Sequence, residues 1–310
     1  MKCFAIILVL STIAFHEYLC LGQIPSMNDE HCVWYKVCVR NKTKVKNCAY
    51  DGPPKILDSE GVNLLKKWCP NLIPKNKTED VLTCCDIEQI KDLVNGVATA
   101  ASILNRCPSC FANFLQPICE FTCSPHQSSF IKVVEKKINT LTNRTFVNEI
   151  DLYITEKFIN GSYDSCKNVN FPSSGQLAFD LMCGAWGATK CTPKRLFHYW
   201  GDESEDFVPF QINYIMANST DPINGFKPLN PRIVPCNESI DGITSPCSCI
   251  DCTSTCPKAP PSMLLQQKFT SFWDTDKFTV FMFLIYLICC VLFVIWSTYC
   301  LSSNIATKTG

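Results

Sequence analysis

The sequence predicts a disulfide-rich domain of helices and a few strands outside a membrane, followed by one transmembrane helix. The chain of 310 residues contains 23 cysteines, a density typical of secreted or lumenal domains that disulfides hold together. A short apolar run lies at the N-terminus, and a longer run without charges lies near the C-terminus. The formal net charge is zero, so the composition gives no reason to expect a nucleic-acid partner.

The N-terminal run has the features of a cleaved signal peptide, which we place at residues 1–22. Lys2 precedes an apolar segment over residues 3–15, and the small residues Cys20 and Gly22 suit the −3 and −1 positions of a cleavage site. The alternative is an N-terminal membrane anchor, but a run of about 13 residues is too short to span a bilayer.

The C-terminal run predicts a transmembrane helix over residues 278–298. Residues 278–296 carry no charge, and at about 1.5 Å per residue they approach the ~30 Å thickness of a hydrocarbon core. A buried core helix is the alternative, although such an uninterrupted apolar run at a chain end favours a membrane span. The signal peptide then places residues 23–256 in the lumen or outside the cell, residues 257–277 in a proline-containing linker and residues 299–310 in the cytoplasm.

The cysteines of the expected ectodomain are even in number. Cys3 and Cys20 belong to the signal peptide, and Cys289, Cys290 and Cys300 belong to the membrane helix or its edge. The other 18 can pair completely into nine bridges, but their spacing leaves the connectivity open. They are Cys32, Cys38, Cys48, Cys69, Cys84, Cys85, Cys107, Cys110, Cys119, Cys123, Cys166, Cys183, Cys191, Cys236, Cys247, Cys249, Cys252 and Cys256.

Two Cys-x-x-Cys pairs, Cys107 with Cys110 and Cys249 with Cys252, have the spacing of zinc ligands or of a redox-active pair. An oxidising compartment and only three ectodomain histidines argue against zinc. A redox-active Cys107–Cys110 pair would need a thioredoxin-like strand and helix around it, which the sequence does not indicate. We therefore expect structural disulfides, no metal and no cofactor.

The first part of the ectodomain contains one clear helix. Residues 32–54 end in a Gly-Pro-Pro turn, and Asn47 is interpreted from the residues alone as a turn residue. Asp58 or the serine after it can cap a helix, which ends at Cys69 because a proline follows.

A second helix is expected over residues 83–104, where apolar residues recur at intervals of three and four. Gly96 lies in the middle of this pattern and can divide it into two helices. Gln89 falls at the border of the apolar face, so the residues alone suggest a solvated helix position.

Residues 107–128 form the stretch to which most of the ectodomain is expected to be linked. They contain four cysteines, and an apolar stripe with helical spacing runs from Phe111 to Ile118. Pro117 complicates this interpretation, because a proline inside a helix removes a hydrogen bond and kinks the chain.

The remaining elements follow from caps, turns and apolar spacing. In chain order we expect a strand with a polar turn over 130–145, a helix over 147–158 that stops at Asn160, a short helix over 172–183, a helix from Thr192 to Trp200, and an apolar strand over 207–216.

Glycosylation sequons are spread over the whole ectodomain, which indicates one glycosylated globular domain. Their asparagines are Asn41, Asn76, Asn143, Asn160, Asn218 and Asn237.

Catalytic motifs are missing from the sequence. It contains no Gly-x-Ser-x-Gly elbow, no His-Glu-x-x-His pair and no phosphate-binding glycine loop, so we expect no catalytic residues and no enzyme activity. The apolar helices carry more large side chains than a domain with nine bridges needs for stability. This excess favours a ligand-binding cavity.

A series of cysteine motifs resembles the N-terminal lumenal domain of the Niemann-Pick type C cholesterol transporter family, including its intestinal members. The resemblance covers residues 31–258 and the first membrane span that follows them. The motifs are Cys-Val-Trp-Tyr at 32–35, Asn-Cys-x-Tyr-x-Gly-Pro-Pro at 47–54, Cys-Cys-Asp at 84–86, Arg-Cys-Pro-Ser-Cys-Phe at 106–111, Cys-Glu-Phe-Thr-Cys-Ser-Pro at 119–125 and Pro-Cys-Ser-Cys-x-Asp-Cys at 246–252.

The resemblance implies an α+β fold in which helices cover a small mixed sheet and enclose a deep sterol pocket. Asn47 and Gln89 would bind the buried 3-hydroxyl of cholesterol or a related sterol. Leu181 and Met182 would form the pocket entrance and the docking face for a soluble lumenal sterol carrier. The pocket lining implied by the family is Trp34, Leu93, Ile118, Pro209, Phe210 and Ile212.

The resemblance also implies a disulfide pairing. It joins Cys32 to Cys84, Cys38 to Cys48, Cys69 to Cys119, Cys85 to Cys123, Cys107 to Cys247, Cys110 to Cys166, Cys183 to Cys191, Cys236 to Cys249 and Cys252 to Cys256.

Two departures from the family affect the expected function. Val37 stands where the family has a glutamate and Ile118 where it has a phenylalanine, so the preferred sterol can differ. The family also continues through many more spans, including a sterol-sensing domain. We therefore expect either a truncated product or a membrane-tethered sterol-binding module, in the late endosome or lysosome by resemblance or in the plasma membrane. The rival interpretation is a folate- or riboflavin-binding type of ectodomain.

Overall fold

The computed structural model describes residues 31–41, 44–74, 80–171, 174–257 and 277–306. The expected signal peptide, most of the expected linker and the sequon at Asn76 lie outside these residues. The described part of the ectodomain up to residue 256 forms one compact unit, and the C-terminal helix belongs to a second one.

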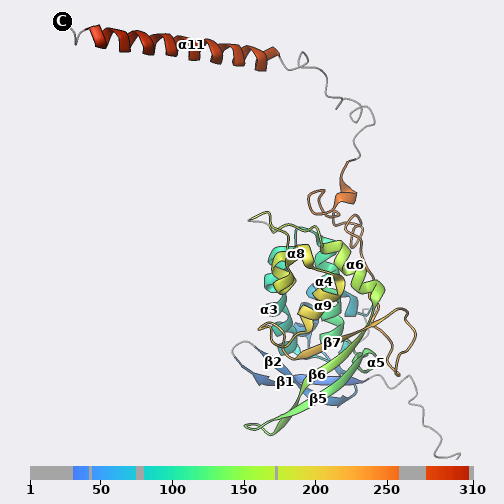
Figure 1. The fold of residues 1–310 in the computed structure, drawn as a ribbon. Coiled ribbons are helices and arrows are strands. Elements are labelled where there is room, and N and C mark those ends of the chain that lie inside the picture. The colour runs from blue at the N-terminus through green and yellow to red at the C-terminus, as the bar shows by residue number, and fades with distance from the viewer. Residues whose placement is uncertain (1–30, 42–43, 75–79, 172–173, 258–276, 307–310) are drawn as a thin grey trace, which may run out of the picture. The chain divides into compact units, whose positions relative to one another are not determined.

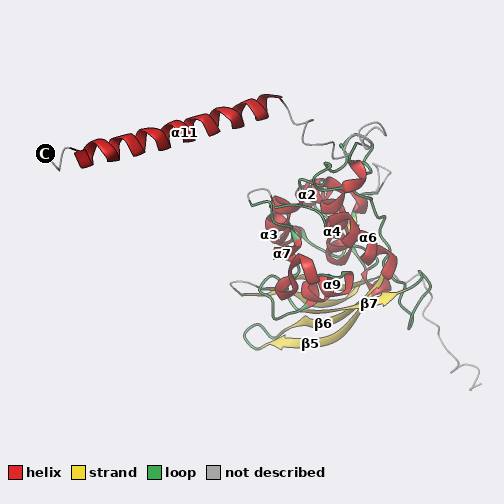
Figure 2. Cartoon of the chain, turned by 45° about the horizontal axis from the view of Figure 1, so that its top comes forward, coloured by secondary structure: helices red, strands yellow, loops and turns green. Residues whose placement is uncertain are grey.

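A five-stranded mixed sheet forms one layer of the ectodomain (Figures 1 and 2). Four strands are antiparallel in the order β1-β2-β6-β5, and β7 pairs with β6 in parallel. A separate two-stranded ribbon joins β3 to β4. The bounds are β1 Cys32–Arg40, β2 Val45–Gly52, β3 Lys55–Ile56, β4 Leu82–Thr83, β5 Ile131–Asn139, β6 Arg144–Thr155 and β7 Gln211–Ala217.

The helices gather on one side of this sheet (Figure 2), which confirms the predicted α+β architecture with a small mixed sheet. They are α2 Ser59–Trp68, α3 Ile87–Leu104, α4 Pro108–Cys123, α5 Gln127–Phe130, α6 Glu156–Cys166, α7 Phe179–Met182, α8 Gly187–Lys190 and α9 Pro193–Gly201, with 3-10 turns at Pro70–Leu72, Gly184–Trp186 and Thr253–Thr255.

The caps inferred from the sequence are present. Asp58 accepts a hydrogen bond from the backbone N–H of Gly61 at the start of α2, and Thr192 accepts one from Arg195 at the start of α9. By contrast, Gly96 does not divide α3, which is a single helix because the buried stripe continues on both sides of this exposed glycine. Pro117 likewise lies inside an unbroken α4.

The helix predicted over residues 147–158 is wrong. These residues belong mainly to β6, and the helix α6 begins only at Glu156. Both faces of β6 are covered toward its C-terminal end, so its apolar residues are nearly continuous and imitate helical spacing. Asn160 consequently lies on the exposed side of α6 and does not stop it.

The strands β1 and β2 were not predicted. Register shifts interrupt their pairing at Trp34, Val37 and Val39, so the alternation of apolar and polar residues that marks a strand is broken.

Nine disulfides link the ectodomain, and seven of them match the pairing implied by the family. The last two implied pairs are wrong, because Cys236 pairs with Cys252 and Cys249 with Cys256. A turn that begins at Ser248 brings the buried Cys252 back into the domain, whereas Cys249 stays on the exposed side of the turn.

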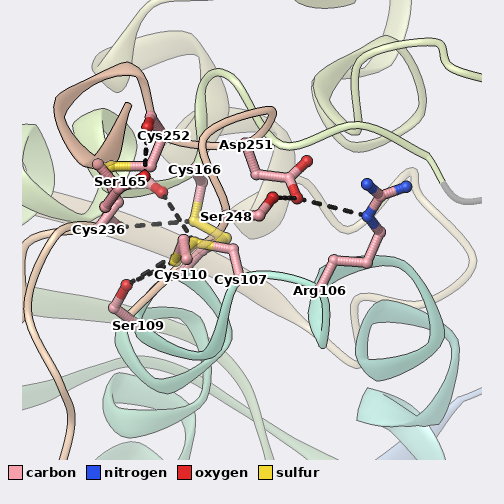
Figure 3. Close-up of a disulfide and its surroundings, with 12 residues drawn as sticks. Arg106, Cys107, Ser109, Cys110, Ser165, Cys166, Cys236, Ser248, Asp251 and Cys252 are labelled. Carbon is pink, nitrogen blue, oxygen red and sulfur yellow. Dashed lines mark hydrogen bonds and ion pairs between the residues drawn. A yellow bond between two sulfur atoms is a disulfide. The ribbon is translucent and has the colours of Figure 1, made fainter. Parts of the chain in front are cut away.

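The bridges of Cys107 and Cys110 lie close together at the start of α4 (Figure 3). Cys107 is joined to Cys247 and Cys110 to Cys166, so Cys107 and Cys110 do not form a redox pair with one another. Both sulfur atoms belong to fully buried residues. These bridges fasten the C-terminal segment and α6 to α4.

A buried carboxylate also holds the C-terminal segment, as Figure 3 shows. Asp251 accepts hydrogen bonds from the backbone N–H of Asn170 at 3.0 Å and from the hydroxyl of Ser248 at 2.9 Å. Arg106 completes the environment, with its Nε 3.4 Å from Asp251 Oδ2. Although burial opposes the charged form, these donors and Arg106 lower the pKa of Asp251.

The helix α11, Lys277–Ala306, contains a 20-residue segment, Thr279–Thr298, with a mean hydropathy of 2.8. This segment is long and apolar enough to cross a membrane, and none of it is buried. Cys289 and Cys290, which lie in this helix, form no disulfide.

Candidate functional site

Gln89 is the N3 residue of a capping box at the start of α3. Its backbone N–H donates to Asp86 Oδ1 at 3.0 Å, and its Oε1 accepts from the backbone N–H of Asp86 at 3.2 Å. This arrangement holds the side chain against the end of the helix, where it is 3% exposed. The solvated position inferred from the sequence alone is therefore wrong.

A bulge in β1 supplies a second hydrogen bond to the same oxygen. The backbone N–H of Lys36 donates to Gln89 Oε1 at 2.8 Å. Lys36 has a φ of 69°, within a stretch where the register of β1 and β2 shifts. The bulge therefore turns the Lys36 N–H out of the ladder and toward α3.

The nitrogen of the same amide has no acceptor. Gln89 Nε2 is buried, and it makes no hydrogen bond to any of the described residues. A buried donor without a partner costs about 1–3 kcal/mol. Such a group at an otherwise well-bonded position indicates a place where a ligand can supply the missing acceptor.

Asn47 lies at the same bulge. It is the β2 partner of Val37, the residue that follows Lys36, and it is half-buried. The disulfide Cys38–Cys48 joins the next residues of the two strands and fixes this register. Within the described part of the chain, the Asn47 side chain makes no hydrogen bond, so its amide can present either its oxygen or its nitrogen.

A charged pair ties α3 to the end of β1. Both terminal nitrogens of Arg40 donate to Asp92, at 2.7 and 2.8 Å. This fork-shaped pairing raises the pKa of Arg40, mainly through the side-chain hydrogen bonds that Arg40 donates to Asp92. Asp92 lies one turn after Gln89, so the pair fixes the helix relative to the bulge.

Three of the residues expected to line a pocket pack together on the sheet side. Trp34 is fully buried, and its ring meets those of Phe121 and Phe210 edge-on at 4.9 and 5.8 Å. Phe210 and Ile212 are buried in the same cluster, which covers β6. Pro209, next to Phe210, is half-buried.

The other two lining candidates belong to the cluster formed by the helices. Leu93 of α3 is buried there, and Ile118 of α4 packs against it while half-buried. The lining residues implied by the family thus divide between the sheet-side cluster and the helix-side cluster. Tyr214 and Leu229 pack against both clusters and mark where they meet.

A row of aromatic rings runs from this meeting point to α4. Tyr214 meets Phe197 edge-on at 5.1 Å, Phe197 lies 5.3 Å from Trp200, and Trp200 meets Phe114 edge-on at 5.0 Å. Desolvation raises the pKa of the Tyr214 phenol, although the residue keeps some accessible surface. This row could not be predicted from the sequence, because its members come from three separate elements.

The expected entrance lies beside Trp200, the third ring of this row. Leu181 is 55% exposed on α7, and Met182 is half-buried. Trp200 Nε1 donates to the backbone carbonyl of Met182 at 3.0 Å, and the disulfide Cys183–Cys191 closes the following loop. The exposed leucine therefore lies on a short helix whose last residue is bonded to the aromatic row.

The described part of the chain contains no cluster of three His, Cys, Asp or Glu side chains that could hold a metal. The described sequon asparagines are exposed, as glycosylation requires. They are Asn41, Asn143, Asn160, Asn218 and Asn237.

Comparison with known proteins identifies the family of this chain. The profile of the family described as "Niemann-Pick C1 N terminus" matches residues 29–275. The chain belongs to this family.

Relatives carry the names of cholesterol transporters. "NPC intracellular cholesterol transporter 1" of Sus scrofa is 37% identical over 247 residues, which are 78% of this chain and 19% of that protein. "NPC1-like intracellular cholesterol transporter 1" of Mus musculus is 30% identical, over 79% of this chain and 19% of that protein. The chain thus spans about a fifth of the length of these relatives.

Proposed function

We propose that this Niemann-Pick C1 N-terminal domain binds cholesterol or a related sterol while α11 tethers it to a membrane, and that it holds the sterol for intracellular transport or uptake. The role is binding without a chemical step. The observation that carries the proposal is the buried, unpartnered Nε2 of Gln89 at the bulge that also contains Asn47.

In this proposal the sterol head lies at the bulge. Gln89 Nε2 donates to the 3-oxygen, and Asn47 supplies the second hydrogen bond. A new acceptor for Gln89 relieves the cost of a buried donor without a partner, whereas a ligand without a polar head leaves that cost in place.

The sterol body would lie between the helix-side cluster and the sheet-side cluster. The half-buried Ile118, Phe121 and Tyr214 support this position, because each packs against one or both clusters and still keeps accessible surface. Burying about 500 Å² of sterol is worth roughly 12 kcal/mol before the costs of association. A hydroxyl hydrogen bond adds only about 1 kcal/mol net. Burial would therefore determine affinity, and the polar head contacts would determine selectivity.

Leu181 and Met182 would form the entrance, and the exposed leucine would be the contact for a soluble lumenal sterol carrier. By relation to the family, the domain faces the lumen of a late endosome or lysosome. The exposed sequon asparagines support a lumenal or extracellular position.

Equilibrium binding of radiolabelled cholesterol to the full chain in detergent tests the proposal. We expect saturable binding by the wild type, at least tenfold weaker binding after Gln89→Ala, and about fivefold weaker binding after Asn47→Ala. Asn95→Ala is the matched control, because Asn95 lies exposed on the same helix. Wild-type protein that binds no cholesterol, or that binds folate or riboflavin in preference, would contradict the proposal.

A further inference from the structure

We propose that Gln89 is held as a hydrogen-bond donor only, so that the site selects ligand heads by their ability to accept a hydrogen bond and takes 3-ketosterols as well as 3-hydroxysterols. This inference rests on the proposed function, and it defines the class of ligand more narrowly.

The oxygen of the Gln89 amide is fully used by the protein. An amide oxygen has two acceptor positions. Here they receive the backbone N–H groups of Lys36, at 2.8 Å, and Asp86, at 3.2 Å. Rotating the amide by 180° would turn its NH2 group toward these two donors and leave both without an acceptor. The ligand therefore meets nitrogen and not oxygen.

The two backbone donors are themselves held in place by covalent links. Lys36 lies two residues before Cys38, which is bridged to Cys48 on the neighbouring strand. Asp86 follows Cys84 and Cys85, which are bridged to Cys32 and Cys123. The bulge and the start of α3 therefore cannot move apart easily to release the amide.

The bidentate Arg40–Asp92 pair adds a further restraint between the same two elements. It joins the last residue of β1 to α3 one turn beyond Gln89. We assign Arg40 and Asp92 as positioning residues, since they act on the ligand only through Gln89.

Asn47 does not require the ligand head to carry a hydroxyl proton. Its side-chain amide is not committed to any group in the described part of the chain, so it can accept from a hydroxyl or donate to a ketone. A ketone oxygen, with two acceptor positions, can therefore take hydrogen bonds from both Gln89 and Asn47. A protonated amine can only donate, so it leaves Gln89 without an acceptor.

The test is competition against radiolabelled cholesterol on the full chain in detergent. The competitors share the sterol body and differ at carbon 3: 5-cholesten-3-one, 5-cholestene without an oxygen, and 3β-amino-5-cholestene. We expect the ketone to compete within fivefold of cholesterol, and the other two to be at least tenfold weaker than cholesterol.

Two variants distinguish selection by Gln89 from a general loss of structure. Gln89→Leu should weaken binding of cholesterol and ketone at least tenfold while 5-cholestene binds as it does to the wild type. Unchanged binding of 5-cholestene shows that the variant is folded. If it is lost, Gln89→Met provides the same comparison with a more flexible side chain.

The outcomes separate the two proposals. Cholesterol binding with a ketone more than fivefold weaker, or with an amine as strong as cholesterol, overturns donor-only selection and leaves sterol binding intact. No saturable cholesterol binding by the wild type contradicts the proposed function itself.

Discussion

A single buried carboxylate, that of Asp251, holds the C-terminal cysteine-rich segment in place. It is almost completely buried, yet four groups satisfy it: the backbone and side chain of Asn170, the hydroxyl of Ser248 and the guanidinium of Arg106. A buried carboxylate is stable only with such partners. It holds the C-terminal cysteine-rich segment against the rest of the ectodomain.

The lowered pKa of Asp251 gives a pH-dependent prediction. A carboxyl whose pKa is lower in the folded state stabilises the fold above its unfolded pKa, near 4, and loses this contribution as the pH falls through the folded value. We expect Asp251→Asn to cost about 1–3 kcal/mol at pH 7.

Thermal unfolding of the full chain measures this cost. At about 2–4 °C per kcal/mol, the midpoint should fall by several degrees at pH 7, and the difference from wild type should shrink below pH 4. Glu238→Gln, at an exposed carboxylate in the same segment, should leave the midpoint unchanged at both pH values. A loss that is equal at pH 7 and pH 3 would mean that the charge of Asp251 does not matter.

Gln89 illustrates what could be known from sequence at the scale of a residue. The Asp-x-x-Gln spacing before an apolar run signals a capping box and could have shown that Gln89 is not an ordinary solvated residue. The second partner could not be foreseen, because Lys36 is 53 positions away and its N–H is free only through the bulge in β1.

At the scale of elements, the site depends on how α3 is held against β1. The capping box, the Lys36 hydrogen bond and the Arg40–Asp92 pair lie along one line of contact between these elements. The start of α3 could be predicted from the sequence, because its capping box has a known spacing. The irregular strand β1 could not, because its register shifts break the alternation that marks a strand.

Breaking the Arg40–Asp92 pair should loosen the contact between β1 and α3 without changing the packing of the hydrophobic core. We expect Asp92→Asn to weaken cholesterol binding several-fold and to leave binding of 5-cholestene unchanged, because only the polar head contact depends on the position of Gln89. The reversed pair, Arg40→Asp with Asp92→Arg, should recover most of the affinity. Equal losses for both ligands would instead indicate a general structural role.

In other elements too, features set by neighbouring residues were predicted and features set by distant residues were not. The caps of α2 and α9 followed from a few neighbouring residues and are confirmed. β6 was mistaken for a helix, since a strand buried on both faces shows no alternation. Its place inside the sheet depends on β7, which pairs with it from far along the chain.

At the scale of the whole molecule, disulfides supply order that the sequence pattern cannot reveal. Cys107–Cys247 spans 140 residues and joins the start of α4 to the C-terminal segment. The cysteine count predicted nine bridges but no connectivity, and the family likeness supplied seven pairs correctly. The last two depend on the local turn at Ser248, which is where this chain differs from the implied pairing.

The structure of the full chain bound to cholesterol would show directly whether the sterol head lies at the bulge of β1. We expect the sterol to lie between the helix-side and sheet-side clusters, with its 3-oxygen about 3 Å from Gln89 Nε2 and within hydrogen-bonding reach of Asn47. A sterol whose oxygen points instead toward Leu181, or one bound outside these two clusters, would contradict recognition of the sterol head by Gln89.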